Sequence, residues 1–223
     1  MVRPEDTILD FGAGTGAILH SLAGFSKAQV SVEFNPHARR FTNEHFPQIT
    51  TYQYPEQVPK GTIDLVFSTS VLEHVECPIQ ELRALRNALK PGGRAVIGIK
   101  NEGMELWRNW TSCADATKKT CNFKLMSKGG SGYNVDNHLW TWNSMLLGNT
   151  MRAAGFIIDE IRYRGTIAKV EMDIQRKRFG RAGHTFQYIY CLAHKPTVGE
   201  AWPQNGEAAL RPLAVSFQGV GAL

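Results

Sequence analysis

Residues 8–16 read Ile-Leu-Asp-Phe-Gly-Ala-Gly-Thr-Gly, an apolar run that ends in an acid and continues into three alternating glycines. This order predicts a strand that turns sharply around a ligand, because glycines let the backbone adopt positive φ and approach a bound molecule closely. Asp10 and Phe11 stand at the end of the strand, where they can reach the edge of such a ligand. The stretch therefore indicates a site for a nucleotide-type cofactor.

The same turn fits two cofactor classes. Gly12-Ala-Gly14-Thr-Gly16-Ala17 also matches the GxGxxA variant of the dinucleotide-binding fingerprint, which is typical of NAD-dependent oxidoreductases. Both classes need an acid at the end of the second strand, where a carboxylate accepts hydrogen bonds from ribose hydroxyls. Glu33, seventeen positions after Gly16, supplies that acid. The turn alone leaves both cofactors open.

Two later stretches distinguish the two classes. Residues 63–77 read Ile-Asp-Leu-Val-Phe-Ser-Thr-Ser-Val-Leu-Glu-His-Val-Glu-Cys, and residues 85–99 read Leu-Arg-Asn-Ala-Leu-Lys-Pro-Gly-Gly-Arg-Ala-Val-Ile-Gly-Ile. Together with the glycine turn, they resemble class I S-adenosylmethionine-dependent methyltransferases. The resemblance is close from residue 7 to about residue 100 and looser to about residue 194. It implies S-adenosylmethionine as the cofactor.

The resemblance also implies a fold and a subgroup. The fold would be α/β, a Rossmann-like, doubly wound sheet of seven mostly parallel strands with an antiparallel last strand. The Leu-Glu-His-Val stretch, the Leu-Lys-Pro-Gly-Gly turn and the His-Leu-Trp-Thr-Trp run at 138–142 look like the group that methylates small molecules, sugars or lipid precursors. The resemblance leaves the residues after 194 unexplained.

Composition favours a single globular domain. The 223 residues are 43% apolar and 20% charged, which is enough apolar material for a sizeable core. No apolar run approaches the roughly 18 residues of a membrane span, and we expect neither a span nor a signal peptide. Cys77, Cys113, Cys121 and Cys191 form no CxxC pair, so we expect no metal site, no disulfide framework and a reducing, cytoplasmic compartment. The net charge of +5 permits an anionic partner.

Strands and helices alternate after the glycine turn, which predicts a parallel sheet with helices on both faces. The expected strands are residues 7–11, 29–33, 49–52, 63–68, 94–100, 156–163 and 185–194. The expected helices are residues 16–24, 36–46, 78–89 and 141–154, with Asn35 and Thr141 as caps and Gly155 as a terminator. The last two strands resemble the antiparallel final pair of the methyltransferase sheet, which dinucleotide dehydrogenases lack.

Three segments fall outside this alternation. Residues 101–140 lack periodicity, and a loop of that length inside a domain spanning 1–194 predicts an insertion that covers the substrate. Residues 195–223 predict a flexible or packed-on tail. The first strand begins at residue 7, whereas the family usually has a helix before it. We therefore expect either a partner surface that completes the lid or a more open cofactor site.

By resemblance, the ends of the first four strands would bind the cofactor. The backbone of Gly12–Gly16 would hold its methionine part, and Asp10 would bind its amino group. Glu33 would accept both ribose hydroxyls, and Phe34 would pack against adenine. Many relatives place an acid after the third strand, where this chain has Gln53 instead. The full expected set is Asp10, Phe11, Gly12, Ala13, Gly14, Gly16, Glu33, Phe34, Gln53, Ser68 and Thr69.

Two histidines are candidates for a general base, because imidazole titrates near neutral pH. His74 follows the fourth strand, although Glu73 and His74 can instead shape the loop through backbone hydrogen bonds, which is the interpretation we favour. His138 stands before a predicted helix, where it can face the substrate or act as a cap. Aromatic residues predicted to contact the acceptor are Trp107, Tyr133 and Trp140, although these and their neighbours Trp110 and Trp142 can also pack the insertion against the sheet.

A basic cluster borders the last two strands and could bind phosphate, carboxylate or RNA. Its members are Arg162, Arg164, Lys169, Arg176, Lys177, Arg178 and Arg181. A solvated charged loop would have the same composition. No RNA-reading module accompanies the cluster, so we expect an acceptor with an anionic group rather than a nucleic acid.

These observations predict an enzyme that transfers a methyl group from S-adenosylmethionine to an oxygen or nitrogen of a small or medium-sized acceptor. Such a transfer is an in-line displacement, in which the protein mainly aligns the reactants and excludes water. The alternatives are a methyltransferase-like binding subunit without activity, an NAD-dependent oxidoreductase and an RNA methyltransferase. An oligomer or a partner subunit is compatible with each.

Overall fold

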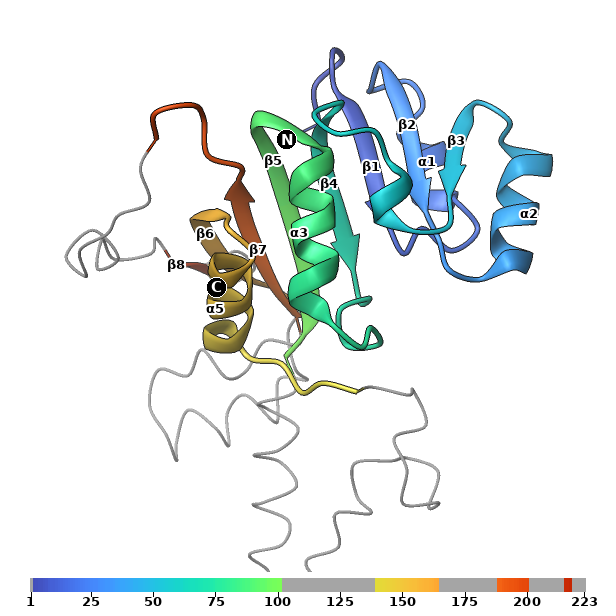
Figure 1. The fold of residues 1–223 in the computed structure, drawn as a ribbon. Coiled ribbons are helices and arrows are strands. Elements are labelled where there is room, and N and C mark those ends of the chain that lie inside the picture. Colours follow the sequence, from blue (N-terminus) through green and yellow to red (C-terminus); the bar gives the residue numbers. More distant parts are fainter. Residues whose placement is uncertain (1, 102–138, 165–187, 201–214, 218–223) are drawn as a thin grey trace, which may run out of the picture.

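The structure is a computed structural model that describes residues 2–101, 139–164, 188–200 and 215–217. Its centre is one sheet with the strand order β3-β2-β1-β4-β5-β7-β6-β8 (Figure 1). The strands are β1 (Thr7–Phe11), β2 (Ala28–Val32), β3 (Ile49–Tyr52), β4 (Ile63–Thr69), β5 (Leu89–Lys100), β6 (Ile157–Arg164), β7 (Tyr188–His194) and β8 (Val215–Phe217). The helices are α1 (Ala17–Ser21), α2 (Pro36–His45), α3 (Pro78–Ala88) and α5 (Ser144–Ala153), with a 3₁₀ turn η1 (Pro55–Gln57).

The directions of the strands confirm the predicted α/β architecture. β3, β2, β1, β4 and β5 run parallel to one another, and β7 runs antiparallel to both β5 and β6. The short strand β8 pairs in parallel with β6 and comes from the segment that was expected to be a tail. The sheet therefore has the expected seven strands and one more at its edge, because Val215–Phe217 finds an open strand edge beside β6.

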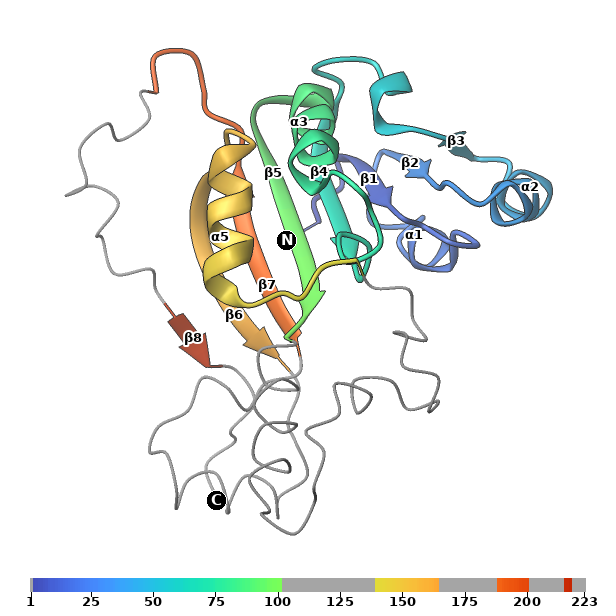
Figure 2. The ribbon, with the colours of Figure 1, turned by 60° about the horizontal axis from the view of Figure 1, so that its bottom comes forward.

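Helices cover both faces of the sheet (Figure 2). On one face α3 and α5 bury apolar side chains such as Leu85 and Met151 in the larger core. On the other face α1 places Leu19 against Ile8 and Leu65 in a smaller core. Within the part of the chain that the structure describes, no helix is long and apolar enough to cross a membrane.

Most elements end within about one residue of their predicted bounds, and β5, α5 and α1 depart from them further. β5 starts at Leu89 instead of residue 94, because Leu89 already pairs with Ile63 and the pairing shifts register before it resumes at Arg94. The predicted Lys-Pro-Gly-Gly turn is therefore an irregularity inside the strand. Helix α5 is capped by Asn143, whose side chain accepts the backbone N–H of Leu146, and not by Thr141. Helix α1 ends at Ser21 and continues as turns.

Ion pairs close the end of the sheet that lies opposite the glycine turn. Asp6, buried just before β1, accepts a hydrogen bond of 2.6 Å from the Arg94 guanidinium. Asp64 binds the Lys90 ammonium at 2.7 Å and also accepts the backbone N–H of Thr7. Burial opposes the charge on Asp64, but these donors outweigh it and hold the pKa of the carboxyl below its usual range. The pairs join β1, β4 and β5 at their starts.

The turn between β1 and α1 depends on the missing side chains of two glycines. Gly12 has φ of 78° and Gly14 has φ of 55°, both in the left-handed region that other residues avoid. A Cβ on Gly12 would overlap the Val71 side chain, whereas a Cβ on Gly14 would meet nothing within 4 Å. Gly12 is therefore required by conformation and by packing, and Gly14 by conformation alone.

Gly12→Ala should destabilise the fold more than Gly14→Ala. The shared left-handed backbone costs about 1–2 kcal/mol for an alanine. At Gly12 the overlap with the stiff, β-branched Val71 adds about 1–3 kcal/mol of overpacking. Urea denaturation of both variants in the absence of any ligand measures the difference. Equal destabilisation of the two variants would contradict the close packing of Val71 on Gly12.

Candidate functional site

The carboxyl ends of β1, β2 and β4 meet at one edge of the sheet, where the chain crosses between strands. The backbone N–H groups of Gly12 and Ala13 donate to the carbonyl of Val32 at 2.8 and 3.3 Å, which joins the glycine turn to the end of β2. In open α/β sheets, ligands bind in the crevice outside these strand ends. The turn is therefore placed at the edge where a cofactor is expected.

Glu33 directly follows β2 and faces the glycine turn. Its Oε2 accepts the backbone N–H of Gly14 at 2.7 Å, and its Oε1 accepts the backbone N–H of Asn35 at 2.8 Å. The Arg39 guanidinium donates to the carbonyls of Glu33 and Phe34 at 2.8 and 2.7 Å. The carboxylate is thereby held beside the turn by backbone donors on both of its oxygens.

Asp10 lies at the end of β1, only 3% exposed. Burial, together with the negative charge of Glu33, raises the pKa of this carboxyl to about 7. Its Oδ2 has no hydrogen-bond partner among the described residues. A buried carboxylate oxygen without a donor is costly, and a bound cation or N–H donor would satisfy it.

Aromatic side chains line the flank of the turn. Phe34 packs edge-to-face against Phe11, with ring centroids 5.6 Å apart, and against Tyr54 at 5.9 Å. The Gln53 amide is engaged with this flank, because its Nε2 donates a hydrogen bond to the Tyr54 hydroxyl at 2.8 Å. Phe34 and the half-exposed Tyr54, whose rings are inclined at 62° to each other, thus offer aromatic surface of the kind that packs against a base.

Ser68 and Thr69, at the end of β4, differ in their surroundings. The Ser68 hydroxyl is buried and donates to the carbonyl of Phe11 at 2.9 Å, which joins β4 to β1 below the turn. Thr69 is exposed at the strand end. Ser68 is therefore engaged in holding the two strands together, and Thr69 is accessible from the edge.

The loop after β4 carries His74 and meets the segment that precedes α5. His74 is exposed and Glu73 is buried. The backbone carbonyl of Glu73 accepts the N–H of Leu139 at 2.7 Å, which joins this loop to the segment before α5. The Trp140 indole is 40% exposed and donates its N–H to the carbonyl of Val75 at 2.8 Å.

Several predicted residues lie outside the described residues or away from the turn. Trp107, Tyr133 and His138, with Trp110, belong to the segment that the structure does not describe, as do Lys169, Arg176, Lys177, Arg178 and Arg181. Arg162, on β6, pairs with Glu160 at 2.6 Å. Trp142 is 2% exposed and belongs to the larger core. Of the predicted aromatic group, Trp140 is thus the member that the structure places at this edge.

Sequence reasoning missed three residues that shape this edge. Tyr54 could have been found from its position next to Gln53. Arg39 lies on α2, and it supports this edge through hydrogen bonds to the backbone carbonyls of Glu33 and Phe34, which precede the helix. Val71, in the loop after β4, contacts Gly12, in the turn after β1, and no local sequence pattern predicts such a contact.

The residues present fit S-adenosylmethionine. This molecule carries a cationic amino group, a ribose and an adenine, and the edge offers a buried acid, an oriented carboxylate and a cluster of aromatic side chains. Open space beside Gly14 leaves room for a ligand to approach the backbone. Among the residues that the structure describes, no three His, Cys, Asp or Glu side chains are grouped so that they could hold a metal ion.

Comparison with known sequences supports this fit. The family model described as a methyltransferase domain matches residues 3–161. An uncharacterised 37.1 kDa protein of transposon TN4556 from Streptomyces fradiae is 35% identical over 109 residues, covering 43% of this chain and 30% of the relative. A tRNA U34 carboxymethyltransferase of Hydrogenovibrio crunogenus is 31% identical over 103 residues, covering 40% and 31%. The matches span less than a third of these curated relatives.

Comparison with solved structures supports the fold. An S-adenosylmethionine-dependent methyltransferase of Archaeoglobus fulgidus superposes with a TM-score of 0.61 at 16% identity, covering 87% of this chain and 88% of that one. At this identity the likeness concerns the fold, whereas the family match rests on more than half of the sequence. The chain therefore belongs to the methyltransferase domain family, and its fold is that of the class I members that use S-adenosylmethionine.

Proposed function

We propose that this chain transfers a methyl group from S-adenosylmethionine to an oxygen or nitrogen nucleophile of a small or medium-sized acceptor. The observation that carries the proposed methyl donor is the Glu33 carboxylate, held 2.7 Å from the Gly14 N–H beside the glycine turn. A carboxylate fixed at this point suits the two hydroxyls of a ribose, because each of its oxygens can accept a further hydrogen bond.

Each part of the cofactor has a proposed partner. Asp10 would bind the amino group, since the buried oxygen that lacks a donor gains one there. The backbone of Gly12–Gly16 would bind the methionine part, and Phe34 with Tyr54 would pack against adenine. Phe11, Ala13 and Thr69 would complete the lining. Ser68 acts indirectly, by joining the ends of β1 and β4.

The chemistry asks for alignment more than for acid–base groups. When bound, the cofactor supplies a methyl carbon that positive sulfur already activates. The chain has to hold the acceptor in line with that carbon and exclude water. His74, exposed in the loop after β4, would accept a proton from the acceptor if its nucleophile needs one. Trp140 would contribute its exposed ring to the acceptor side.

An RNA acceptor is the second candidate. It is favoured by the relatives of this chain that are named tRNA U34 carboxymethyltransferases, one of which is 31% identical over 103 residues. The basic cluster that begins on β6 and continues after it in the sequence has the charge that a phosphate backbone needs. The small-molecule proposal rests instead on the aromatic residues gathered in the sequence before α5.

One labelling experiment tests the function and separates the two acceptors. The purified chain is incubated with methyl-labelled S-adenosylmethionine and either a nuclease-treated small-molecule extract or total RNA. We expect label in small molecules. Label in RNA alone would replace the first acceptor by the second. Binding of S-adenosylhomocysteine with no transfer to any fraction would identify a binding subunit, and preferential binding of NAD would overturn the proposal.

Glu33→Gln should weaken the binding of S-adenosylhomocysteine, the demethylated cofactor. The amide offers one acceptor oxygen without charge, so charged hydrogen bonds worth about 1.5–3 kcal/mol are lost. Isothermal titration calorimetry measures the affinity. Glu44→Gln is the matched control, because Glu44 is an exposed acid of α2 whose ion pair with Arg40 is 3.9 Å long. Equal affinities for the two variants would remove Glu33 from the site.

The affinity for S-adenosylhomocysteine should rise between about pH 6 and about pH 8. The raised pKa of Asp10, about 7, keeps this carboxyl protonated at the lower pH, and binding a cationic amino group must then release the proton. Above the pKa the carboxylate is already charged, and the affinity levels off. Calorimetry across this range measures the slope, and Asp10→Asn should flatten it. A slope that survives in Asp10→Asn would assign the titration to another group.

A further inference from the structure

The loop between β4 and α3 touches both sides of the proposed site. We call residues 70–76 the linking loop. It begins at Ser70, a non-glycine residue with φ of 57°, whose N–H donates to the carbonyl of Gly98 at 2.9 Å. A second backbone hydrogen bond, from the His74 N–H to the Val71 carbonyl, closes a tight turn. A non-glycine residue in this region costs energy and persists only where its surroundings determine it, so the start of the loop is held firmly.

On its inner side the linking loop packs against the glycine turn. The Val71 side chain occupies the space that a Cβ on Gly12 would need. Val71 is 9% exposed and belongs to the larger core. Because a β-branched side chain has few rotamers, any displacement of the loop at Val71 changes the space available to the turn.

On its outer side the linking loop is held by the segment that leads into α5. The N–H of Leu139 and, more weakly, that of Trp140 donate to the carbonyl of Glu73, at 2.7 and 3.4 Å. The Trp140 indole donates to the carbonyl of Val75 at 2.8 Å. Two residues further on, Trp142 is buried in the core, which fixes the segment itself.

We propose that Trp140 is a positioning residue, whose indole N–H sets the linking loop and, through Val71, the shape of the glycine turn that binds the cofactor. The inference rests on the proposed function, because it concerns the affinity of that same cofactor site. Trp140 belongs to the acceptor side of the edge, and Gly12 to the cofactor side. The linking loop therefore couples the two halves of the site through packing and hydrogen bonds.

The contacts of the linking loop favour a displacement that passes from Trp140 to Val71 over one that stays confined to the loop beside Trp140. The loop is short, its first residue is strained and bonded to β5, and its carbonyls at Glu73 and Val75 are bonded to a segment anchored in the core. A loop held at both ends cannot relax at one contact without moving at the other.

Trp140→Phe removes the donor and keeps an aromatic ring. We expect the dissociation constant for S-adenosylhomocysteine to rise about three- to tenfold, the size of the net contribution of one hydrogen bond. Leu139→Ala is the matched control, since Leu139 is 59% exposed and donates through its backbone, and it should leave the affinity unchanged. If Trp140→Phe does not fold, Trp140→Leu replaces it. An unchanged affinity in the donor-free variant would overturn the proposal.

A double-mutant cycle with Val71→Ala tests the route of the coupling. Removing the contact with Gly12 should make the loss caused by Trp140→Phe smaller than in the unmodified chain. Additive losses would overturn the coupling. A residue that merely stabilises the fold would lower the melting temperature and leave the affinity, measured well below melting, unchanged. If the unmodified chain does not bind S-adenosylhomocysteine at all, the proposed function fails, whereas binding with an additive cycle refutes this inference alone.

Discussion

The contact between Val71 and the bare Cα of Gly12 is the constraint on which the site depends. It brings the loop after β4 against the turn after β1, so two neighbouring parallel strands deliver their ends to one place. The left-handed backbone at Gly12 and Gly14 lets the turn bend back towards the end of β2. Because Gly12 has no side chain, the loop after β4 packs closely against the turn after β1. The space beside Gly14 stays open for a ligand.

Two acids meet at this edge in different environments. Glu33 accepts two backbone N–H groups, while Asp10 is buried, with one oxygen lacking a donor and with Glu33 as a negative neighbour. Burial and that neighbour raise the pKa of Asp10 to about 7, so the free protein loses stability through this group as pH rises from about 4 to about 7, where only the unfolded chain ionises it. The cost of ionising the buried Asp10 carboxyl therefore falls at a position where a bound cationic group would offset it.

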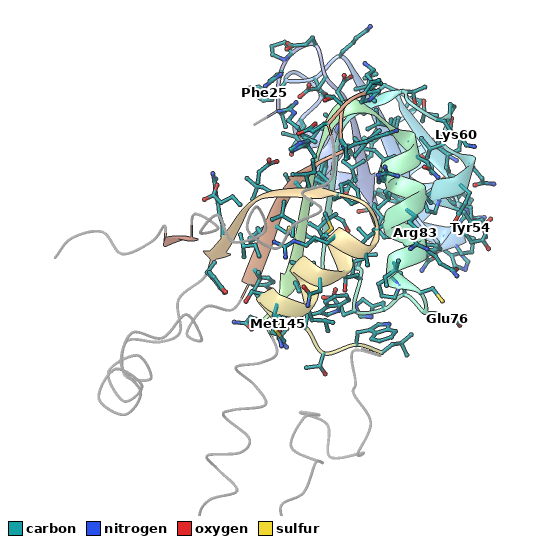
Figure 3. The ribbon with its side chains drawn as sticks, turned by 60° about the vertical axis from the view of Figure 1, so that its left-hand side comes forward. Phe25, Tyr54, Lys60, Glu76, Arg83 and Met145 are labelled. Carbon is teal, nitrogen blue, oxygen red and sulfur yellow. The ribbon has the colours of Figure 1, made fainter. Side chains whose placement is uncertain are left out.

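Figure 3 shows that the exposed Tyr54 and Glu76 lie on the same flank of the molecule, whereas Met145 lies at the start of α5.

The elements predicted with the right bounds are those whose signals are local. β1 and β3 match their expected residues, and α2 begins after Asn35, whose side chain accepts two backbone N–H groups. The misses have non-local causes. Leu89 joins β5 because it pairs with Ile63, and β8 exists because β6 offers it an edge. Asn143 replaces Thr141 as the cap because Trp142 is drawn into the core, which shifts the start of α5.

The sequence by itself determined the class of fold and a site for a nucleotide-type cofactor, because spacing along a strand and a glycine turn are local properties. Its resemblance to class I methyltransferases then indicated which cofactor binds there. The sequence also placed an acid after the second strand, at Glu33. Only the tertiary structure decided that Glu33 faces Gly14, that burial raises the pKa of Asp10, and that Trp140 binds the loop that holds Val71 on Gly12. These features depend on distances between residues far apart in the chain, which packing sets and no local pattern encodes.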